Sequence, residues 1–441
     1  MEEVPFVVLG SGMAGLGASY ALNSAGASFV CYEKNSYVGG HSRSIRYSNG
    51  FVFDEGGHIS FTKNTQVQQI LAENVLGEFV ESRLIIDNHW QGRRLPHPIQ
   101  NNLRHLPPEL IVQIIADYKQ PEPPLAAIGT DATSKQTYAN WLISSYGPTF
   151  AKTFPMVYGK KYHTTETENL TTDWIGPRMY RPTIQELVRS ALPDTTPIPN
   201  YIDHFRYPSS GGFSSFLDPF AKRLDIRLNK RVTYLDPVTR ILQFADGDRI
   251  AYGTVISSIP LPDLISLISG VPDDVLASSR KLAFSTAWLV NLGVDRADLS
   301  DAMVTYFYDD DVLLSRINMP HLFSNQNAPD GCGTIQAEIY FSDKYKPFFD
   351  SPQRLIDRTI ADLRRCNILR PQDQILLADA IMSRYANVIY DFDRTDALRD
   401  VHGYLNDVGI RYCGRFGNWD HAWTDEAFVS GEESAKAALG S

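Results

Sequence analysis

Residues 5–35, "PFVVLGSGMAGLGASYALNSAGASFVCYEKN", decide the fold. An apolar run predicts a buried strand, the turn that follows matches GxGxxG, and the small apolar residues after it predict a helix. Gly10, Gly12 and Gly15 permit a tight turn that brings the N–H groups of a helix N-terminus close to a pyrophosphate. Glu33 ends the second strand, where a carboxylate can accept ribose hydroxyls. The segment predicts a Rossmann-like dinucleotide-binding unit; the alternative is a tight strand-to-helix turn that binds nothing.

Composition restricts the classes of partner. The chain has 441 residues, which suggests roughly two or three domains. It is 43% hydrophobic and 21% charged, as is ordinary for a soluble globular protein, and its net charge is −10. That charge disfavours a nucleic-acid or anionic-membrane binder, so an anionic ligand would need a local arginine pocket. We expect a soluble cytoplasmic protein with a small-molecule substrate, no nucleic-acid or membrane partner, and an oligomeric state that the sequence leaves open.

The sequence offers few protein-borne reactive groups. Its four cysteines are scattered, without CxxC or metal-ligand spacing, so we expect reduced thiols and no metal site. There is no GxSxG, HExxH or P-loop pattern.

A second glycine cluster indicates which dinucleotide this domain is expected to bind. Residues 33–43, "EKNSYVGGHSR", place Gly39-Gly40 before Ser42 and Arg43. This resembles the cluster that runs beside the pyrophosphate and flavin of FAD in flavoproteins of the amine-oxidase class, whereas NAD enzymes usually lack it. In that class another glycine pair passes the flavin ring, and "FDEGGHISFTKN" (53–64) supplies Gly56, Gly57 and His58. The cofactor expected from this resemblance is FAD.

The rest of the chain suggests how the domains are organised. We expect a helix capped by Asn64, surface connectors over 120–136 and 193–200, and a β-meander over 226–261 with a turn at Asp246-Gly247. Residues 333–341, "GTIQAEIYF", alternate as a half-buried strand. The final strand, glycine turn and helix are expected to join the first segment in one nucleotide-binding domain.

The expected fold is α/β: a Rossmann-like FAD-binding domain with an inserted helical domain and a β-sheet-containing substrate domain. The FAD-binding domain is expected to be discontinuous and to comprise residues 1–85, 205–262 and 380–441. A mainly helical substrate or lid domain is expected over 86–204. An α+β substrate domain with an antiparallel sheet is expected over 263–379.

Most of the chain resembles the UDP-galactopyranose mutases, in particular their eukaryotic-type branch. Besides the glycine motifs, four stretches carry the resemblance: "LPHPIQNNLRHLP" (95–107), "WIGPRM" (174–179), the arginine of "YFYDDDVLLSRI" (306–317) and "GRFGNW" (414–419). The resemblance implies a redox-neutral interconversion of pyranose and furanose forms of an NDP-sugar. In it, N5 of reduced FAD attacks the anomeric carbon and the nucleotide leaves. NAD(P)H is a candidate reductant.

The resemblance also implies roles for individual residues. Arg178 and Arg316 match the two arginines that clamp the pyrophosphate, and planar guanidinium groups suit phosphate. His58 matches the histidine beside the flavin. The other substrate-binding positions implied are Tyr306, Tyr390, His97, Gln100, His163 and His421. The cofactor-binding positions implied are Gly10, Ser11, Gly12, Gly15, Glu33, Lys34, Gly40, Ser42, Arg43, Gly56, Gly57, His58, Val232, Gly414, Arg415 and Asp425.

Several positions depart from the family pattern. Where the family usually has an aromatic or amide contact for uridine or phosphate, this sequence has His97, Gly159, His163 and His421. The nucleotide and the sugar therefore stay open. An amine-oxidase-like FAD oxidoreductase, which transfers hydride from an amine, an alcohol or an unsaturated ring, is the main alternative, and a non-catalytic flavin- or nucleotide-binding protein is a third. The arginine pair favours the mutase and the altered uridine positions favour the oxidoreductase. For the individual histidines, tyrosines and arginines, core packing or a surface position is the structural alternative.

Overall fold

A computed structural model of the protein describes residues 1–118, 136–176, 179–193 and 204–440. The chain divides into two compact units, each built from separate stretches of sequence. The first unit comprises Met1–Glu81, Arg206–Ala283 and Asp393–Ser441, and the second comprises Ser82–Phe205 and Phe284–Phe392. The connectors expected over 120–136 and 193–200 fall almost wholly outside the described residues.

The first unit is built on a seven-stranded sheet with the order β10-β11-β12-β1-β2-β9, in which β18 also pairs with β12. Strands β12, β1, β2 and β9 are parallel, as are β12 and β18, whereas β10, β11 and β12 form an antiparallel meander. This meander confirms the sequence prediction. The bounds of these strands are β1 (Glu2–Leu9), β2 (Phe29–Tyr32), β9 (Ile226–Arg227), β10 (Val232–Asp236), β11 (Ile241–Phe244), β12 (Arg249–Ser257) and β18 (Ile410–Tyr412).

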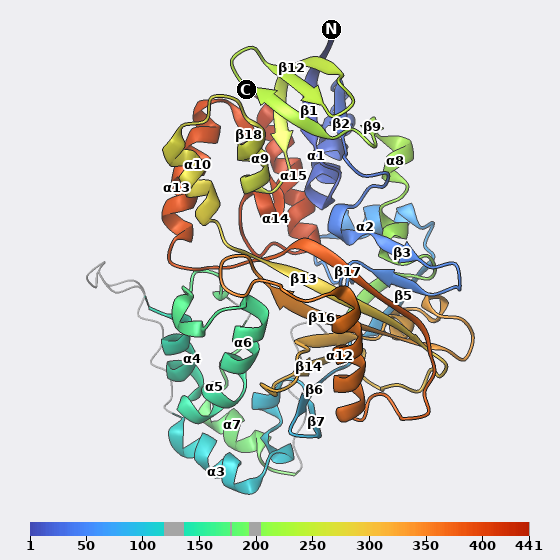
Figure 1. The fold of residues 1–441 in the computed structure, drawn as a ribbon, viewed down its shortest axis with the longest axis vertical. Coiled ribbons are helices and arrows are strands. Elements are labelled where there is room, and N and C mark those ends of the chain that lie inside the picture. Colours follow the sequence, from blue (N-terminus) through green and yellow to red (C-terminus); the bar gives the residue numbers. More distant parts are fainter. Residues whose placement is uncertain (119–135, 177–178, 194–203, 441) are drawn as a thin grey trace. The chain divides into compact units, whose positions relative to one another are not determined.

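Helices and short elements complete the first unit (Figure 1). The capping expected at Asn64 is confirmed, because its side chain accepts hydrogen bonds from the N–H groups of Gln66 (3.0 Å) and Val67 (3.1 Å). The elements are α1 (Met13–Ser24), η1 (Gly40–Ser42), β3 (Ser44–Arg46), β4 (Val52–Asp54), α2 (Thr65–Asn74), η6 (Phe213–Phe216), α8 (Phe220–Arg223), α9 (Leu261–Leu267), α10 (Asp273–Lys281), α13 (Arg394–Asp407), α14 (Gly414–Gly417) and α15 (Thr424–Leu439).

Helices α1 and α15 lie side by side and touch through their backbones (Figure 1). A Cβ atom added at Gly431 would lie 1.8 Å from the carbonyl oxygen of Ala14. A Cβ added at Gly17 would lie 2.0 Å from the carbonyl oxygen of Phe428. Because neither carbonyl can move without disrupting its helix, these two positions require glycine.

The second unit also contains a seven-stranded sheet, with the order β17-β13-β16-β15-β14-β6-β7. All neighbouring strands are antiparallel except β14 and β6. The chain passes between the units four times, and the first two passages fall within β5 (Phe79–Arg83) and β8 (His204–Pro208), which pair with each other. The strands of the second sheet are β6 (Ile86–Trp90), β7 (Arg93–Pro96), β13 (Phe284–Val294), β14 (Val304–Phe307), β15 (Arg316–Asn318), β16 (Gly333–Phe341) and β17 (Ile375–Val388).

Its helices are mostly short. They are η2 (Ile99–Asn101), η3 (Leu103–His105), α3 (Pro108–Asp117), α4 (Tyr138–Tyr146), α5 (Pro148–Thr153), α6 (Pro155–His163), η4 (Thr167–Asn169), α7 (Ile184–Ser190), α11 (Pro320–Phe323), η7 (Asn325–Asn327) and α12 (Pro352–Arg365). Helix α12 packs with Leu355, Ile356 and Leu363 onto one face of the sheet.

Strand β16 differs from the expectation of a half-buried strand. Every residue from Gly333 to Tyr340 is buried. One set of alternate side chains, which includes Ile335 and Ile339, joins the apolar cluster under α12. The other set, which includes Gln336 and Glu338, is polar and equally buried. The predicted alternation is therefore present, but the polar set does not face water.

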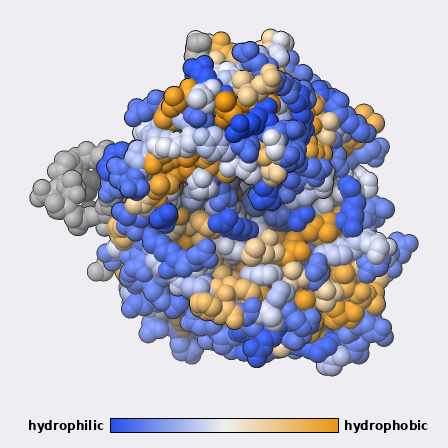
Figure 2. Space-filling model, turned by 45° about the horizontal axis from the view of Figure 1, so that its top comes forward, coloured by the Kyte–Doolittle hydropathy of each residue, from blue (hydrophilic) through white to orange (hydrophobic). Residues whose placement is uncertain are grey.

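On the face seen in Figure 2, hydrophilic residues predominate and hydrophobic residues form smaller groups between them. None of the described helices combines the length and the apolar character needed to cross a bilayer. The described residues also contain no group of three or more His, Cys, Asp or Glu side chains placed to hold a metal ion.

We predict that Gly431→Ala lowers the free energy of unfolding by more than about 3 kcal/mol, because the methyl group would overlap a helical carbonyl oxygen. Gly403→Ala in α13 is the matched control, since a Cβ there meets nothing within 4 Å. The control should stabilise by about 0.5–1 kcal/mol through helix propensity. Urea unfolding followed by circular dichroism measures both, and equal stability of the two variants would contradict the packing argument.

Candidate dinucleotide and anion sites

The glycine turn between β1 and α1 has the geometry of an anion cradle. Gly10 has φ +89°, and a Cβ added at Gly15 would lie 1.8 Å from the carbonyl oxygen of Gly10, so the helix starts directly against the end of the strand. Gly12 is the N-cap of α1 and no side chain caps that end. The N–H groups of the first turn and the positive end of the helix dipole are therefore available to a negatively charged ligand.

Glu33 supports this turn from the end of β2. One carboxylate oxygen accepts hydrogen bonds from Ser11 N (2.8 Å) and Ser11 Oγ (2.9 Å), and the other accepts from Asn35 N (2.9 Å) and Asn35 Nδ2 (2.8 Å). These four donors use the roughly four acceptor positions of a carboxylate. A ribose hydroxyl would have to replace one of the two side-chain donors, of which Ser11 was selected from the sequence and Asn35 was not. Lys34, next in the chain, is exposed.

The second glycine cluster lies against the first. Gly39 N donates to Ser11 O (2.8 Å), and a Cβ added at Gly40 would lie 3.0 Å from the Cα of Gly12. Ser42 is buried. Arg43 Nε donates to Glu55 Oε2 at 2.6 Å, and Glu55 thereby connects this cluster to the GGH segment. Two glycine clusters separated in the sequence thus form one continuous backbone surface.

His58 is held by the segment that carries it. Gly56 has φ +94°, and Nδ1 of His58 lies 2.8 Å from the carbonyl oxygen of Gly56. Because a carbonyl oxygen only accepts, Nδ1 carries the proton in this hydrogen bond, which leaves Nε2 as the acceptor atom of a neutral ring. The ring packs against Phe213, with centroids 5.6 Å apart. Gly57 separates Gly56 from His58 in the sequence.

Asp54 anchors the segment that carries His58 through buried hydrogen bonds. Its buried carboxylate accepts hydrogen bonds from Ser44 Oγ (2.6 Å), Tyr207 Oη (2.7 Å) and Phe213 N (2.9 Å). Burial raises the pKa of Asp54 to about 6, although these hydrogen bonds oppose the shift. Asp54 was not selected from the sequence, yet it positions the residue against which His58 packs.

The C-terminal motif lies at the N-terminal end of α1. Gly414 has φ +75°, and a Cβ there would lie 2.4 Å from the Cβ of Ala14. Gly414 N and Asn418 Nδ2 both donate to Ser430 Oγ, at 3.0 and 3.1 Å. Arg415 follows in α14, and the buried His421 lies in the connection to α15. Val232 is buried at the start of β10.

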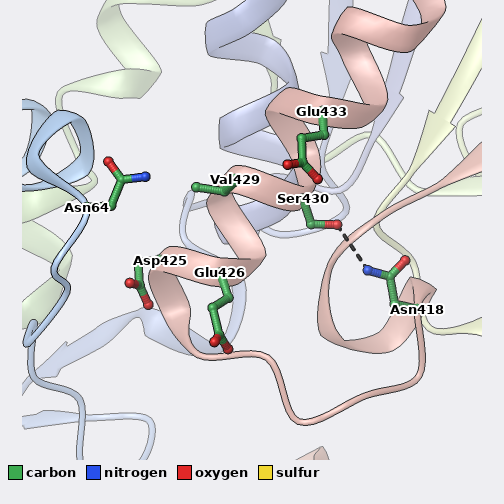
Figure 3. A pocket seen from close by; sticks show the side chains of 7 residues that line it. All are labelled: Asn64, Asn418, Asp425, Glu426, Val429, Ser430 and Glu433. Atoms are coloured by element: carbon green, nitrogen blue, oxygen red, sulfur yellow. Dashed lines mark hydrogen bonds between the residues drawn. The ribbon is translucent and has the colours of Figure 1, made fainter.

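Asp425 lines a pocket of about 350 Å³ at the start of α15 (Figure 3). The pocket is lined by Asn64, Asn418, Asp425, Glu426, Val429, Ser430 and Glu433. Figure 3 shows Asp425, Glu426, Val429, Ser430 and Glu433 on α15, with Asn64 opposite the helix.

The second unit contains a candidate anion site on the polar face of its sheet. Tyr306 is directly opposite Arg316, and Arg316 is directly opposite Glu338, on three neighbouring strands. Arg316 Nε lies 2.7 Å from Glu338 Oε2. Among the described residues, the terminal guanidinium nitrogens of Arg316 make no hydrogen bond. Arg316 therefore has a fixed orientation while two nitrogens remain available to a ligand.

The Arg316–Glu338 pair is charged. Burial would raise the pKa of Glu338, but Arg316 and hydrogen bonds from Tyr340 and Asn318 outweigh it, so that pKa lies below its usual range. Burial would likewise lower the pKa of Arg316, but Glu338 and the nearby tyrosines raise it instead. The partly exposed guanidinium is thus a permanent cation with a buried counter-ion.

Two further aromatic residues surround Tyr306. His97 packs against it with ring centroids 5.3 Å apart, and Nδ1 of His97 lies 3.0 Å from Oδ1 of Asn88. Burial lowers the pKa of His97 to about 4, so it is neutral at physiological pH. Tyr158, on α6, meets Tyr306 edge-on at 5.2 Å. Gln100 follows His97 in η2 and is partly buried.

The structure does not bring every selected residue to this cluster. Arg178 lies outside the described residues. His163 is buried among aromatic rings, 4.9 Å from Tyr162 and 5.2 Å from Trp174, and burial lowers its pKa to about 3. Tyr390 is also buried, and its backbone carbonyl accepts from Thr171 N at 2.7 Å. His421 belongs to the first unit. For these positions a substrate contact stays a prediction.

Tyr158, Glu338 and Lys161 were not identified from the sequence. Glu338 is the one charged residue in residues 333–341, and this was the available signal, because an ionised side chain in a buried strand requires a partner. Tyr158 and Lys161 gave no comparable signal, since the helix that carries them is rich in both residue types.

Comparison with known proteins agrees with this description. Residues 8–73 match the family model of the NAD(P)-binding Rossmann-like domain. The fold is thus α/β, with a Rossmann-like domain and several sheets, as expected.

Solved structures share this fold over the whole chain. The crystal structure of reduced UDP-galactopyranose mutase matches with a TM-score of 0.89 and 23% identity over 99% of this chain and 96% of that chain. A putative protoporphyrinogen oxidase from Exiguobacterium matches with a TM-score of 0.70 and 15% identity over 100% and 99% of the two chains. Putrescine oxidase bound to putrescine matches with a TM-score of 0.66 and 17% identity, also over 100% and 99%.

We predict that Asp54 makes folding pH-dependent. Its pKa in the folded protein is about 6, above the ordinary value of 3.8. The proton therefore binds more tightly in the folded state, so this contribution to stability is fully present below about pH 4 and is lost as the pH rises through about 6. Asp54→Asn should gain up to about 3 kcal/mol relative to the wild type between pH 4 and pH 7.

Urea unfolding at several pH values measures this difference. Asp218→Asn is the control, because its carboxylate is half exposed and lies 3.5 Å from Arg46. The control difference should stay within about 0.5 kcal/mol across the range. Parallel stability curves for the wild type and Asp54→Asn would contradict the assignment.

Proposed function

We propose that this protein is an FAD-dependent, redox-neutral mutase that interconverts pyranose and furanose forms of an NDP-sugar. The observation that carries the proposal is Arg316, a guanidinium oriented by a buried carboxylate, with its terminal nitrogens unbonded among the described residues. An arginine of this kind suits a pyrophosphate, which a hydride-transfer substrate such as an amine does not contain. Because the chain carries a net charge of −10, an anionic substrate can bind only where a local cation offsets the overall repulsion.

The first unit suits FAD. A Cβ added at Gly12 would meet only Gly40 Cα, at 4.0 Å, so the space above the uncapped N-terminus of α1 is open to a pyrophosphate. Glu33 would hold the adenosine ribose after one of its side-chain donors is displaced. Reduced FAD would supply the nucleophile for the anomeric carbon, and NAD(P)H is the reductant we propose.

The chain's own residues then have separate tasks. Arg316 would hold the pyrophosphate while the glycosidic bond breaks and again while it reforms, with the hydroxyls of Tyr306 and Tyr158 as further donors. His58, whose Nδ1 proton is occupied by Gly56 O, would present Nε2 as a hydrogen-bond acceptor. We place FAD binding in the first unit and nucleotide binding in the second.

An amine-oxidase-like FAD oxidoreductase is the second candidate. The similar folds of a putative protoporphyrinogen oxidase and of putrescine oxidase favour it, as do the histidines at expected uridine positions. A fold of this kind hosts several chemistries, so the reaction has to be decided by assay.

The deciding experiment is an anaerobic assay on the purified protein after reduction with dithionite. UDP-, GDP- and dTDP-hexoses are each supplied, and the products are separated by chromatography. A new isomer that forms only with the reduced protein is the expected result. No isomer from any donor, together with substrate-dependent bleaching of the oxidised flavin by amines or alcohols, would replace the mutase by the oxidoreductase.

We predict that Arg316→Lys lowers kcat/KM by about 10- to 100-fold, mainly through a higher KM. Lysine keeps a charge beside Glu338 but loses the planar pair of donors, which corresponds to about 1.4–2.8 kcal/mol. Arg365→Lys is the control, because this half-exposed arginine pairs with Asp311 and Asp362 instead. Equal kinetic constants for the two variants would show that Arg316 does not bind the substrate.

We also predict that His58→Ala binds FAD normally, as judged by its absorption spectrum, but turns over about 100-fold more slowly. The glycine backbone that would hold the cofactor is untouched, whereas the acceptor atom Nε2 is lost. His105→Ala, at an exposed position, serves as the control. Unchanged turnover of His58→Ala would exclude the role.

A further inference from the structure

Lys161, on α6, makes hydrogen bonds of an unusual kind for a lysine. Its partly buried Nζ donates to three backbone carbonyl oxygens: Asp309 O at 2.6 Å, Leu314 O at 3.2 Å and Phe307 O at 3.3 Å. Each of the three donors of an ammonium group thus has an acceptor. Lys160, the preceding residue, is more than half exposed and pairs with Glu166.

The three carbonyls all belong to the 307–315 connection, which comprises Phe307 at the end of β14 and the residues between β14 and β15. This connection begins directly after Tyr306 and ends directly before Arg316. The carbonyls of Phe307 and Leu314, near its two ends, are bound to the same nitrogen. Lys161 therefore closes the connection and fixes the distance between the strands that present the tyrosine and the arginine.

Helix α6 contributes to the same cluster. Tyr158 lies three residues before Lys161, on the same side of the helix. It meets Tyr306 at 5.2 Å and Tyr308, within the connection, at 5.9 Å. The ammonium group of Lys161 consequently links α6, which carries Tyr158, to the connection between Tyr306 and Arg316.

We propose that Lys161 is a positioning residue of the anion site: it ties the 307–315 connection to α6 and thereby sets the arrangement of Arg316, Tyr306 and Tyr158 around a nucleoside diphosphate. The proposal rests on the proposed function for the presence of that anion. It assigns to Lys161 no direct contact with the ligand.

The groups around Lys161 make its charge sensitive to pH. Burial lowers its pKa to about 8; Asp309, Asp310 and Asp362 oppose this shift, and Lys346 adds to it. Asp309 is itself held by His89 Nδ1 (2.8 Å) and Gln91 N (2.7 Å). Deprotonation removes the charge and one of the three donors, so the affinity for the anion should fall as the pH rises through about 8.

The test compares Lys161→Met and Lys161→Arg with Lys160→Met, which removes the same charge from the neighbouring position. Titration calorimetry on the full chain measures the Kd of UDP and of inorganic pyrophosphate between pH 6.5 and pH 9. Comparing proteins at the same pH cancels titration of the probe. Hydrogen exchange of residues 307–315 reports on the connection whether or not a ligand binds.

We expect Lys161→Met to bind UDP about 10-fold more weakly than the wild type at pH 7 and to approach it at pH 9. Lys161→Arg should keep the affinity at pH 7 within a few-fold and lose the decline above pH 8, because arginine stays charged. Lys160→Met should follow the wild type. Exchange over 307–315 should be faster in Lys161→Met alone. Lys161→Arg keeps the proposal testable if the methionine variant does not fold.

Three results would overturn the proposal. Equal affinity of all variants at every pH removes the role, and so does faster exchange without a change in affinity, because Lys161 would then be structural only. If the wild type binds neither UDP nor pyrophosphate, the second unit contains no anion site and the proposal fails. If the wild type binds UDP but isomerises no sugar, the proposed function fails while the comparison of Lys161 variants still decides this proposal.

Discussion

The contact between the backbones of α1 and α15 is the constraint on which the first unit depends. A single methyl group at Gly431 would come within 1.8 Å of Ala14 O, so the two helices approach as closely as their main chains allow. The same stretch of α1 is touched by Gly414, and its first turn is touched by Gly40 through Gly12. Segments from three parts of the sequence therefore converge where α1 begins, and the uncapped N–H groups of that turn are placed by all of them.

The second unit depends instead on buried polar groups that are paired with one another. Its sheet has an apolar face under α12 and a polar face whose side chains are nevertheless buried. A charge on such a face is stable only with a partner, and Glu338 meets this need through Arg316, Asn318 and Tyr340. The cost of burying the carboxylate is offset by a guanidinium whose orientation it fixes. Backbone carbonyls have the equivalent role for Lys161.

Much of the first unit was predictable because its signals are local. GxGxxG, the Asn64 cap and the turn at Asp246-Gly247 each act within a few residues, and each has the expected structure. The α/β fold followed from them. By contrast, the four donors around Glu33 include a side chain 22 residues away, and a sequence motif does not report whether a carboxylate is already satisfied.

The candidate site in the second unit was predictable only in part. Arg316, Tyr306 and His97 were selected by resemblance, and the structure brings them together. Glu338 was missed because its strand was expected to be half exposed, where a glutamate needs no explanation. Tyr158 and Lys161 were missed because their partners depend on how α6 packs on the sheet. Contacts of this kind follow from tertiary packing, which the local pattern does not encode.

The interleaving of the two units has a consequence for biosynthesis. Strand β1 pairs with β12, and both the partner strand β18 and the helix α15 follow all segments of the second unit in the sequence. A ribosome that adds about 5–20 residues per second needs about 20–90 s to reach α15. For most of that time the glycine turn of α1 lacks these neighbours, and the second unit, which ends at Phe392, is complete before they are made. The nascent first unit thus exposes the apolar side of α1 until α15 has been made.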